Sequence, residues 1–247
     1  VVVSGPTGSG KSTSLYAALK EIKSERTNIT TVEDPVEYQL DGVNQVQVFE
    51  DIGLTFGSTL RSILRQDPDV LLIGEIRDGE TADIAVKFAL TGHLVFSTVH
   101  ANDAPGTITR LLDIGIAPFL VGSCLNLVMA QRLVRRLCAD CKEEYIPSNE
   151  ELAVVGLDEK KINGSLYQGK GCAECRNTGY KGRLAIFEMI PMARDLRKLV
   201  FDNANEDDIR QTALDNGMTT LRDAGLARVL DGTTSIEEIM RSTVEDL

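Results

Sequence analysis

The segment VVVSGPTGSGKS at residues 1–12 constrains the fold more than any other part of the sequence. It places the pattern G-x-x-x-x-G-K-[ST] directly after an apolar run, and it opens the helical sequence STSLYAALKEI. In such a strand–loop–helix, glycines let backbone N–H groups turn toward a phosphate, and the helix N-terminus adds partial positive charge. An ordinary glycine-rich turn is the alternative. The context favours a nucleotide site.

Two side chains of this loop have predicted roles. Lys11 is expected to reach the β- and γ-phosphates of ATP, and Ser12 is expected to ligate Mg²⁺. The whole predicted phosphate loop comprises Gly5, Pro6, Thr7, Gly8, Ser9, Gly10, Lys11, Ser12 and Thr13. The predicted cofactors at this loop are therefore ATP and Mg²⁺.

Short apolar runs alternate with amphipathic runs through the first half of the chain. The apolar runs predict strands at residues 1–4, 28–32, 69–74 and 94–99. The amphipathic runs predict helices at residues 11–25, 55–66 and 80–92. Near-continuous apolar strands that alternate with helices are typical of a parallel sheet covered on both faces. The predicted fold class is therefore α/β.

Two further segments have local predictions. Residues 37–48, EYQLDGVNQVQV, alternate around Asp41-Gly42, which predicts a tight hairpin. The uncharged run from Ile114 to Gln131 touches the lower length limit of a membrane span, but it carries polar residues, glycines and a proline. A buried globular helix is the preferred interpretation of that run.

Composition excludes some functions. A chain of 247 residues with 43% hydrophobic residues is globular, and it can hold one large domain or two small ones. The net charge of −11 argues against wrapping a nucleic-acid backbone, which needs clustered Lys and Arg. We expect the sequence to be the C-terminal part of a longer protein.

Carboxylates follow two of the predicted strands. Glu75 ends the strand sequence DVLLIGE, where a carboxylate orients the magnesium shell or the attacking water. The segment TTVEDPVEY, residues 30–38, carries Glu33, Asp34 and Glu37 after another strand. A carboxylate at this edge of the sheet can orient or deprotonate a water. A solvated strand end remains the alternative for Glu75, and turn chemistry at Asp34-Pro35 the alternative for Asp34.

Histidines and arginines complete the candidate set. His93 and His100 bracket the strand at residues 94–99, and His100 is better placed to sense a phosphate, whereas His93 has a structural alternative. Arg61, Arg65 and Arg77 are candidate stabilisers of phosphate charge, provided that a neighbouring subunit brings them to its nucleotide. A solvated helix face is the alternative for Arg61 and Arg65.

Four cysteines form two C-x₂-C pairs separated by thirty residues. Two such pairs suit tetrahedral thiolate coordination of Zn²⁺, whereas a redox C-x-x-C needs only one pair. The predicted ligands are Cys138, Cys141, Cys172 and Cys175. Cys124 is expected to be a core thiol. The predicted zinc site has a structural role, because no coordination position is open.

Four motifs in this order resemble a known family. GPTGSGKST, TVEDPVEY, LRQDPDVLLIGEIRD and TGHLVFSTVHANDAP resemble the Walker A, Asp, Walker B and His boxes of secretion ATPases. That family covers type II secretion and type IV pilus motors. The sequence AQRLVRRLCADC…CAEC…GYKGRLAIFEM extends the resemblance through the metal module of the secretion and pilus-extension branches.

The resemblance implies a RecA-like P-loop NTPase core at residues 1–135, a tetracysteine zinc module at 136–184 and a C-terminal helical region at 185–247. It implies a homohexameric ATPase in the bacterial cytoplasm, held at the inner membrane through a polytopic platform protein. Glu37 maps to the proposed catalytic base, and Arg61, Arg65 and Arg77 map to phosphate or subunit contacts. The N-terminal domains of the family are expected to lie outside this sequence.

Several functions remain open at this point. A pilus-assembly motor is preferred, with a type II secretion motor close behind, because the sequence divides these two only weakly. A nucleic-acid translocase is a different class, since hexameric motors of this fold also move DNA; the acidic balance and the cysteine module count against it. An inactive assembly scaffold conflicts with the intact Lys11, Glu37 and Glu75.

Overall fold

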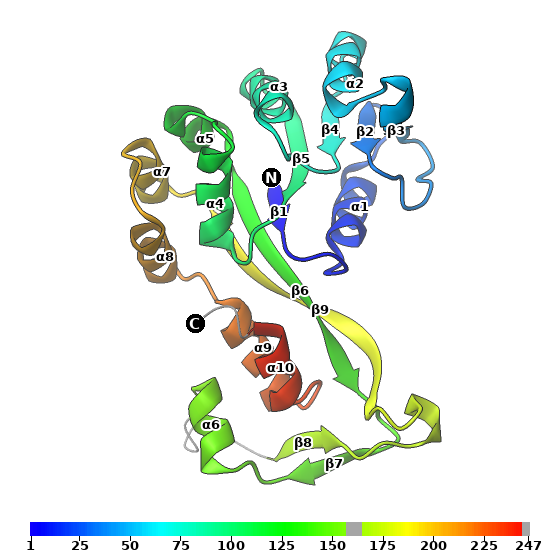
Figure 1. Cartoon of the computed structure of the whole chain (residues 1–247), viewed down its shortest axis with the longest axis vertical. Helices are drawn as coiled ribbons and strands as arrows, with labels where there is room; N and C mark the ends of the chain where they lie inside the picture. The colour runs from blue at the N-terminus through cyan, green and yellow to red at the C-terminus, as the bar shows by residue number, and fades with distance from the viewer. Residues whose placement is uncertain (157–164, 244–247) are drawn as a thin grey trace. The chain divides into compact units, whose positions relative to one another are not determined.

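The computed structural model describes residues 1–156 and 165–243, which fold into two compact units (Figure 1). Unit 1 comprises Val1–Ala130 and Met189–Met218. Unit 2 comprises the described residues of Gln131–Glu188 and those from Thr219 onward. These units cut across the three predicted segments, because the helices after residue 193 are divided between them.

Unit 1 is built on a sheet whose strand order is β3-β2-β4-β5-β1-β6-β9. The pairs β3·β2, β2·β4, β4·β5, β5·β1 and β1·β6 are all parallel. The strands are β1 Val2–Ser4, β2 Ile29–Glu33, β3 Asn44–Gln47, β4 Val70–Ile73, β5 Leu94–Val99, β6 Leu127–Leu137 and β9 Tyr180–Pro191. The predicted α/β class with a parallel sheet is confirmed.

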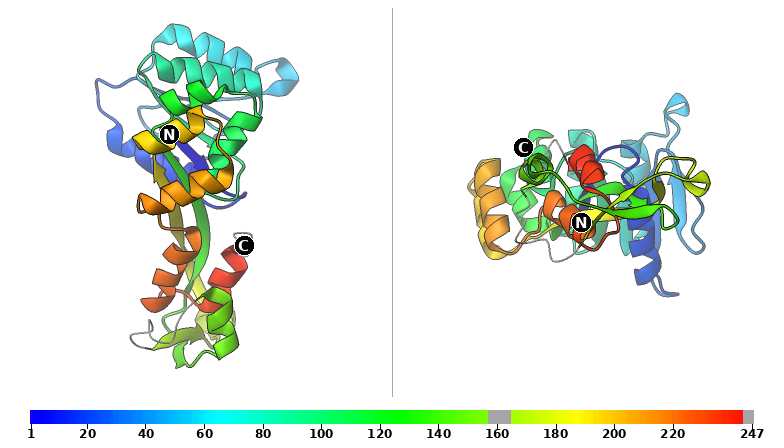
Figure 2. Two further views of the ribbon diagram at one scale, coloured as in Figure 1. Left: turned by 90° about the vertical axis from the view of Figure 1, so that its left-hand side faces the viewer. Right: turned by 90° about the horizontal axis from the view of Figure 1, so that it is seen from below.

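Helices cover both faces of this sheet. On one face, α1 (Lys11–Ile22) packs Leu15, Tyr16 and Leu19 onto alternate strand residues such as Val3, Leu72 and Phe96. On the other face lie α3 (Gly79–Leu90), α4 (Ala104–Asp113) and α5 (Pro118–Cys124), which line an apolar pocket with Val2 and Val95. Figure 2 shows α1 on the opposite side of the strands from α4 and α5. Both faces are therefore buried, as parallel strands require.

The remaining helices of unit 1 extend the second layer. Helix α2 (Phe56–Ile63) continues into the 3₁₀ turn η2 (Leu64–Gln66) and packs on α3, and another 3₁₀ turn, η1, spans Glu50–Ile52. Helix α7 (Arg194–Phe201) packs on α5, and α8 (Glu206–Asp215) packs on α4 and α7. Among the described residues, no helix is both long and apolar enough to cross a membrane.

The predicted hairpin at residues 37–48 is wrong, because β3 pairs with β2 in the parallel direction. Backbone N–H groups in the connection bond to side chains instead of to a second strand. The Gln47 side chain accepts from the Val36 N–H at 3.2 Å, and Gln45 accepts from the Leu40 N–H at 2.6 Å. Asp41-Gly42 forms only a turn, in which Gly42 has a φ of 69°.

The predicted buried helix over residues 114–131 is also wrong. The helical part is only α5, and the chain then enters strand β6 at Leu127. Residues Val128–Ala130 pair with Val2–Ser4 and satisfy the free side of β1. A short apolar run does not by itself distinguish a buried strand from a buried helix. Residues 128–130 form a strand here because the free side of β1 needs a hydrogen-bonding partner.

Unit 2 contains the distal parts of β6 and β9 together with a small antiparallel pair, β7 (Lys142–Tyr145) and β8 (Leu166–Gly169). Its helices are α6 (Asn149–Val155), the 3₁₀ turn η4 (Ala173–Cys175), α9 (Leu221–Leu230) and α10 (Ile236–Thr243). Helix α10 packs on α9 and on α6.

A buried carboxylate on α10 anchors unit 2. Glu238 is fully buried and accepts hydrogen bonds from the Arg135 backbone N–H at 2.9 Å and from the Arg135 guanidinium at 2.7 and 2.8 Å. Arg241 donates to the same carboxylate at 2.7 and 3.1 Å. Burial alone would raise the pKa of Glu238, but these donors outweigh it and hold the pKa below its ordinary value of 4.5.

Glu238→Gln is expected to lower the free energy of unfolding by about 2 kcal/mol at pH 7, because the charged hydrogen bonds from Arg135 and Arg241 to the carboxylate are lost. The loss is not larger because both arginine side chains remain partly exposed to water. A group with a depressed folded-state pKa contributes stability above its unfolded pKa and loses it as pH falls. The difference between the wild type and Glu238→Gln should therefore shrink below pH 4.5. Urea unfolding of both proteins at pH 7, 4.5 and 3 checks this, and a constant difference would contradict it.

Candidate functional site

The predicted phosphate loop lies between the end of β1 at Ser4 and the start of α1 at Lys11. Gly8 and Gly10 have φ values of 79° and 87°, in the left-handed region that glycine adopts without strain. The Lys11 ammonium donates to the Gly5 carbonyl at 2.7 Å and to the Pro6 carbonyl at 3.1 Å. The lysine charge therefore lies within the loop.

The N-terminus of α1 is suited to an anion. Within the described chain, no side chain caps its first turn and no acidic residue lies in that turn. The first N–H groups of a helix lack partners inside the helix, and the helix dipole makes them partly positive. The loop residues Pro6, Thr7 and Gly8 are exposed. A phosphate can therefore approach the loop from solvent and bind these N–H groups.

Glu75 lies at the same edge of the sheet, two residues after β4. Its side chain is 14% exposed, and it accepts from Arg77 Nε at 2.6 Å. His100, which follows β5, places Nε2 at 2.9 Å from the other oxygen of Glu75. The Thr98 hydroxyl donates to the Gly74 carbonyl at 2.6 Å and holds these two strand ends together. The structure thus brings Glu75, Arg77 and His100 into one cluster.

The arginine of this cluster keeps its charge. The Glu75 carboxylate beside it raises the pKa of Arg77. Because its side chain is 58% exposed, Arg77 also remains accessible to a group from outside the unit. Glu75 is held between a cation and an imidazole, so its carboxylate has a fixed direction at the carboxyl edge of the sheet.

Glu33 is the last residue of β2, at the carboxyl end of that strand, but its side chain is buried. It is 4% exposed and accepts hydrogen bonds from the hydroxyls of Tyr16 and Thr31, the latter at 2.6 Å. Gln45 Nε2 also donates to it, at 3.2 Å. A carboxylate with three donors in the interior serves to hold β2, β3 and α1 together.

Glu37 and Asp34 are exposed, in contrast to Glu33. The Glu37 backbone N–H donates to the Tyr16 hydroxyl at 3.4 Å, so Tyr16 links the phosphate-loop helix to this acidic segment. Burial raises the pKa of Tyr16, and the Glu33 carboxylate raises it further. Tyr16 therefore stays a neutral donor to Glu33, a role that its position in an amphipathic helix did not indicate.

The other candidates lie apart from the cluster. Arg61 forms an ion pair with Glu80 of α3, and Arg65 donates to the Arg61 carbonyl at 3.0 Å. Both arginines are exposed. His93 precedes β5, at the amino edge of the sheet, where its ring stacks on Phe88 with centroids 4.1 Å apart. The structural alternative therefore holds for His93.

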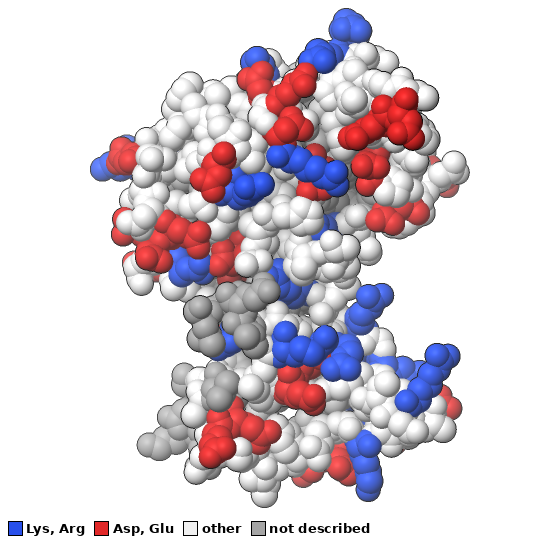
Figure 3. Space-filling view, in the orientation of Figure 1, with Lys and Arg blue, Asp and Glu red and all other residues white. Residues whose placement is uncertain are grey.

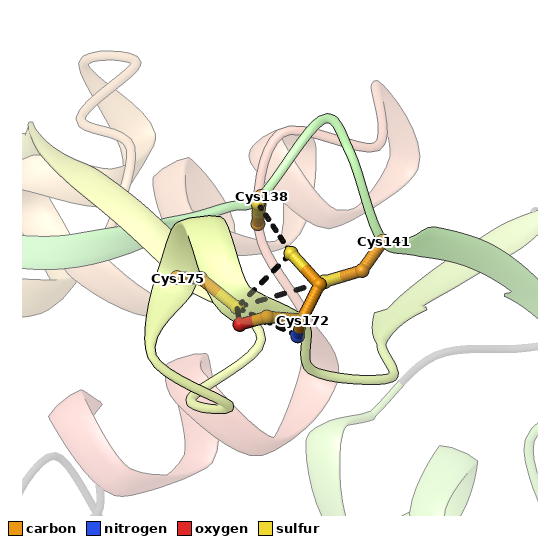
Figure 4. Close-up of side chains that lie close together, drawn as sticks. All are labelled: Cys138, Cys141, Cys172 and Cys175. Carbon is orange, nitrogen blue, oxygen red and sulfur yellow. Dashed lines mark hydrogen bonds between the residues drawn. The ribbon is translucent and has the colours of Figure 1, made fainter.

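The four predicted cysteines converge in unit 2, from the turn after β6 and from the turn η4 (Figure 4). Their sulfur atoms all lie within 4.8 Å of one another. Three of the sulfur–sulfur distances are 3.7, 3.8 and 3.9 Å. A tetrahedral zinc ion with Zn–S bonds of ~2.3 Å separates neighbouring sulfurs by about 3.8 Å. The geometry of Cys138, Cys141, Cys172 and Cys175 therefore fits zinc.

Backbone N–H groups point at these sulfurs. Gly171 donates to Cys141 Sγ at 3.3 Å, and Cys172 and Gly179 donate to Cys175 Sγ at 3.2 Å. Burial alone would raise the pKa of the Cys175 thiol, but these donors lower it to about 6. Gly179 has a φ of 78° and packs on Gly169 so closely that a Cβ there would lie 2.6 Å from the Gly169 carbonyl oxygen. The N–H groups of Cys172 and Gly179 thus favour a thiolate at Cys175, whereas burial outweighs the Gly171 N–H and raises the pKa of the Cys141 thiol to about 12.

Comparisons with known proteins agree with this geometry. The family model described as "Type II/IV secretion system protein" matches residues 1–241. The type IV pilus assembly ATPase PilB of Myxococcus xanthus (strain DK1622) is 51% identical over 248 residues, which cover 100% of this chain and 44% of that protein. The type II secretion system protein E of Pseudomonas aeruginosa (strain PAO1) is 48% identical over 246 residues, which cover 100% of this chain and 49% of that protein.

Solved structures share the fold. The pilus retraction motor PilT with bound ADP superposes with a TM-score of 0.71 at 29% identity, over 97% of this chain and 60% of that one. The ATPase DotB of Legionella pneumophila has a TM-score of 0.69 at 20% identity, over 100% of this chain and 60% of that one, which supports the fold alone. This chain spans about half the length of the curated relatives. It belongs to the type II/IV secretion system protein family.

Proposed function

We propose that unit 1 binds ATP with Mg²⁺ and hydrolyses the bond between its β- and γ-phosphates. The observation that carries this proposal is the meeting of the phosphate loop, Glu75 and His100 at one edge of the sheet. In open α/β folds, ligands bind at the carboxyl ends of the strands. The family relationship supports the same activity, since the relatives are named as pilus and secretion ATPases.

The roles follow from chemistry and position. Lys11 and the backbone of Gly5, Pro6, Thr7, Gly8, Ser9, Gly10, Ser12 and Thr13 bind the phosphates. Ser12 ligates Mg²⁺, which neutralises charge that develops on the phosphate oxygens. Glu75 orients the magnesium shell, and Arg77 and His100 hold it in place. Glu37 is the proposed base for the attacking water, because it is exposed in the segment that follows β2, whereas Glu33 is buried.

Substitutions in the full-length protein can distinguish the roles proposed for Glu33, Glu37 and Glu75. Glu37→Gln is expected to keep ATP affinity but to lower turnover by roughly 10²–10⁴-fold, since the proton acceptor is lost. Glu75→Gln should lower both ATP affinity and turnover. Lys11→Ala, the control for the phosphate loop, should abolish turnover and weaken ATP binding. Glu33→Gln should lower the melting temperature while turnover per folded molecule stays near wild type. Steady-state ATPase rates, nucleotide titrations and melting curves measure these effects.

One result would name a different base. If Glu33→Gln alone lost turnover with normal affinity and normal stability, the assignment of Glu37 would be wrong. If Lys11→Ala hydrolysed ATP at the wild-type rate, the phosphate-loop assignment would be wrong.

We propose further that the whole protein is a homohexameric motor for type IV pilus assembly. It would act in the cytoplasm, at the inner membrane, through a polytopic platform protein. Arg61, Arg65 and Arg77 are exposed and so accessible to a neighbouring subunit, whose nucleotide phosphates they would stabilise. The pilus relatives and the type II secretion relatives differ little in identity, which keeps the secretion motor as the alternative. Neighbouring genes for pilins with a retraction motor, against genes for an outer-membrane secretin set, separate the two.

The net charge favours a protein partner over a nucleic acid. On the face drawn in Figure 3, with the grey residues set aside, acidic and basic side chains are mixed over the upper part, and several basic side chains gather in the middle and lower right. The net charge is −11. Stimulation of hydrolysis by DNA, with salt-dependent binding, would instead favour a translocase.

We also propose that Cys138, Cys141, Cys172 and Cys175 hold one structural Zn²⁺. Zinc bound by four thiolates contributes directly to folding and leaves no position for a substrate. Its residues all lie in unit 2, whereas the proposed nucleotide residues lie in unit 1. Loss of the metal should therefore affect unit 2 first.

Protein purified without chelator is expected to contain about one zinc per chain, measured by elemental analysis. Cys141→Ser should reduce that content and lower the melting temperature, because one of four ligands is lost. Cys124→Ser is the matched control, since Cys124 lies in α5 of unit 1, and it should retain the metal. A wild-type protein without zinc, or equal zinc in Cys141→Ser, would contradict the proposal.

A further inference from the structure

Helix α8 carries an arginine that reaches the carboxyl edge of the sheet. Arg210 Nη2 donates to Asp103 Oδ2 at 2.6 Å and to Glu206 Oε1 at 2.8 Å. The Asp103 side chain is only 11% exposed and that of Arg210 is 32% exposed. Burial alone would lower the pKa of Arg210, but the two carboxylates raise it. Arg210 therefore keeps its charge, and its contact with Asp103 is partly shielded from solvent.

Asp103 has a second set of contacts that lead to the phosphate loop. Its Oδ1 accepts from the Gly106 N–H at 2.7 Å and caps α4. Its backbone carbonyl accepts from the Thr107 hydroxyl at 2.6 Å and from the Ser4 hydroxyl at 3.4 Å. The hydroxyl oxygens of Thr107 and Ser4 are 2.7 Å apart. Because Ser4 directly precedes Gly5, Asp103 is attached to the base of the phosphate loop.

Asp103 also lies close to His100 along the chain. Three residues of extended chain span at most about 10 Å, so fixing Asp103 limits where His100 can lie. His100 in turn contacts Glu75 at 2.9 Å. The loop between β5 and α4 thus connects Arg210 at one end with the Glu75 cluster at the other.

We propose that Arg210 is a positioning residue for ATP hydrolysis, which holds Asp103 so that His100 stays on Glu75 beside the phosphate loop. The inference rests on the proposed function of unit 1. A helix late in the sequence then sets the geometry of residues that come more than one hundred positions earlier. Displacing such groups by about 1 Å can cost 10²-fold in rate, even when the displaced contact is remote from the chemistry.

The alternative is that Arg210 only docks α8 on α4, and the chain offers a matched control for this. Thr109 of α4 donates to Glu206 Oε2 at 3.2 Å, a second link between the same two helices that does not involve Asp103. Thr109→Val removes that link, together with the bond from the same hydroxyl to the Gly106 carbonyl at 3.0 Å, with little change in shape. If docking alone mattered, Thr109→Val and Arg210→Ala would affect turnover alike.

Arg210→Ala in the full-length protein is expected to lower kcat about 10- to 100-fold, with the KM for ATP changed by less than about threefold. Arg210→Lys should recover most of kcat, because one ammonium can donate to both carboxylates. Thr109→Val should keep the wild-type kcat. Asp103→Asn keeps the helix cap but loses the charged acceptor, so Arg210→Ala in that background should cause no further loss.

An equal loss in Thr109→Val, no rescue by lysine or additive losses in the double variant would overturn the inference. Amide hydrogen exchange at Gly106 separates this inference from the proposed activity, since it needs no turnover. It should be faster in Arg210→Ala than in Thr109→Val, and equal exchange would overturn the positioning role. A wild-type protein that does not hydrolyse ATP would instead refute the proposed function, and the exchange result would still decide on Arg210.

Discussion

The parallel pairing of β4, β5 and β1 is the constraint on which the rest of unit 1 depends. Val99 of β5 pairs with Ser4 of β1, and Ser97 pairs with Ile73 of β4. These registers bring three strand ends to one edge of the sheet, and each end is followed by a residue with a proposed role. Parallel strands expose their carboxyl ends together, so segments far apart in sequence meet without a dedicated binding domain.

Buried carboxylates give this arrangement its rigidity. Glu33 binds the hydroxyl of Tyr16 on α1, and Asp103 binds the guanidinium of Arg210 on α8, so both helix layers are tied to the sheet by polar contacts. In unit 2, Glu238 of α10 binds the guanidinium of Arg135 on β6 in the same way. An ionised carboxylate in the interior is tolerated only when donors replace its lost hydration. The Glu33 carboxylate has three donors, the Glu238 carboxylate has donors from Arg135 and Arg241, and the Asp103 carboxylate has two, the Gly106 N–H and the Arg210 guanidinium.

Sequence patterns predict the parts of the fold whose chemistry is local. The phosphate loop has its glycines at fixed offsets, and the two cysteine pairs converge as their spacing indicates. The hairpin at residues 37–48 fails because glutamine side chains, which no periodicity reveals, satisfy the backbone between the strands. The prediction of a helix at residues 114–131 fails because Val128–Ala130 pair with the side of β1 that β5 leaves free. Arg210 is missed for a similar reason, since its partner is distant in sequence.

Amide hydrogen exchange with and without Mg-ATP tests the central claim most directly, namely that phosphates bind at the loop between β1 and α1. Binding should slow exchange of the amides from Gly8 to Thr13, because their N–H groups would then donate to phosphate oxygens. Exchange at Gly171 and Gly179 beside the cysteines should not change. Protection that appeared only outside the phosphate loop, with residues 8–13 unaffected at saturating nucleotide, would contradict the account.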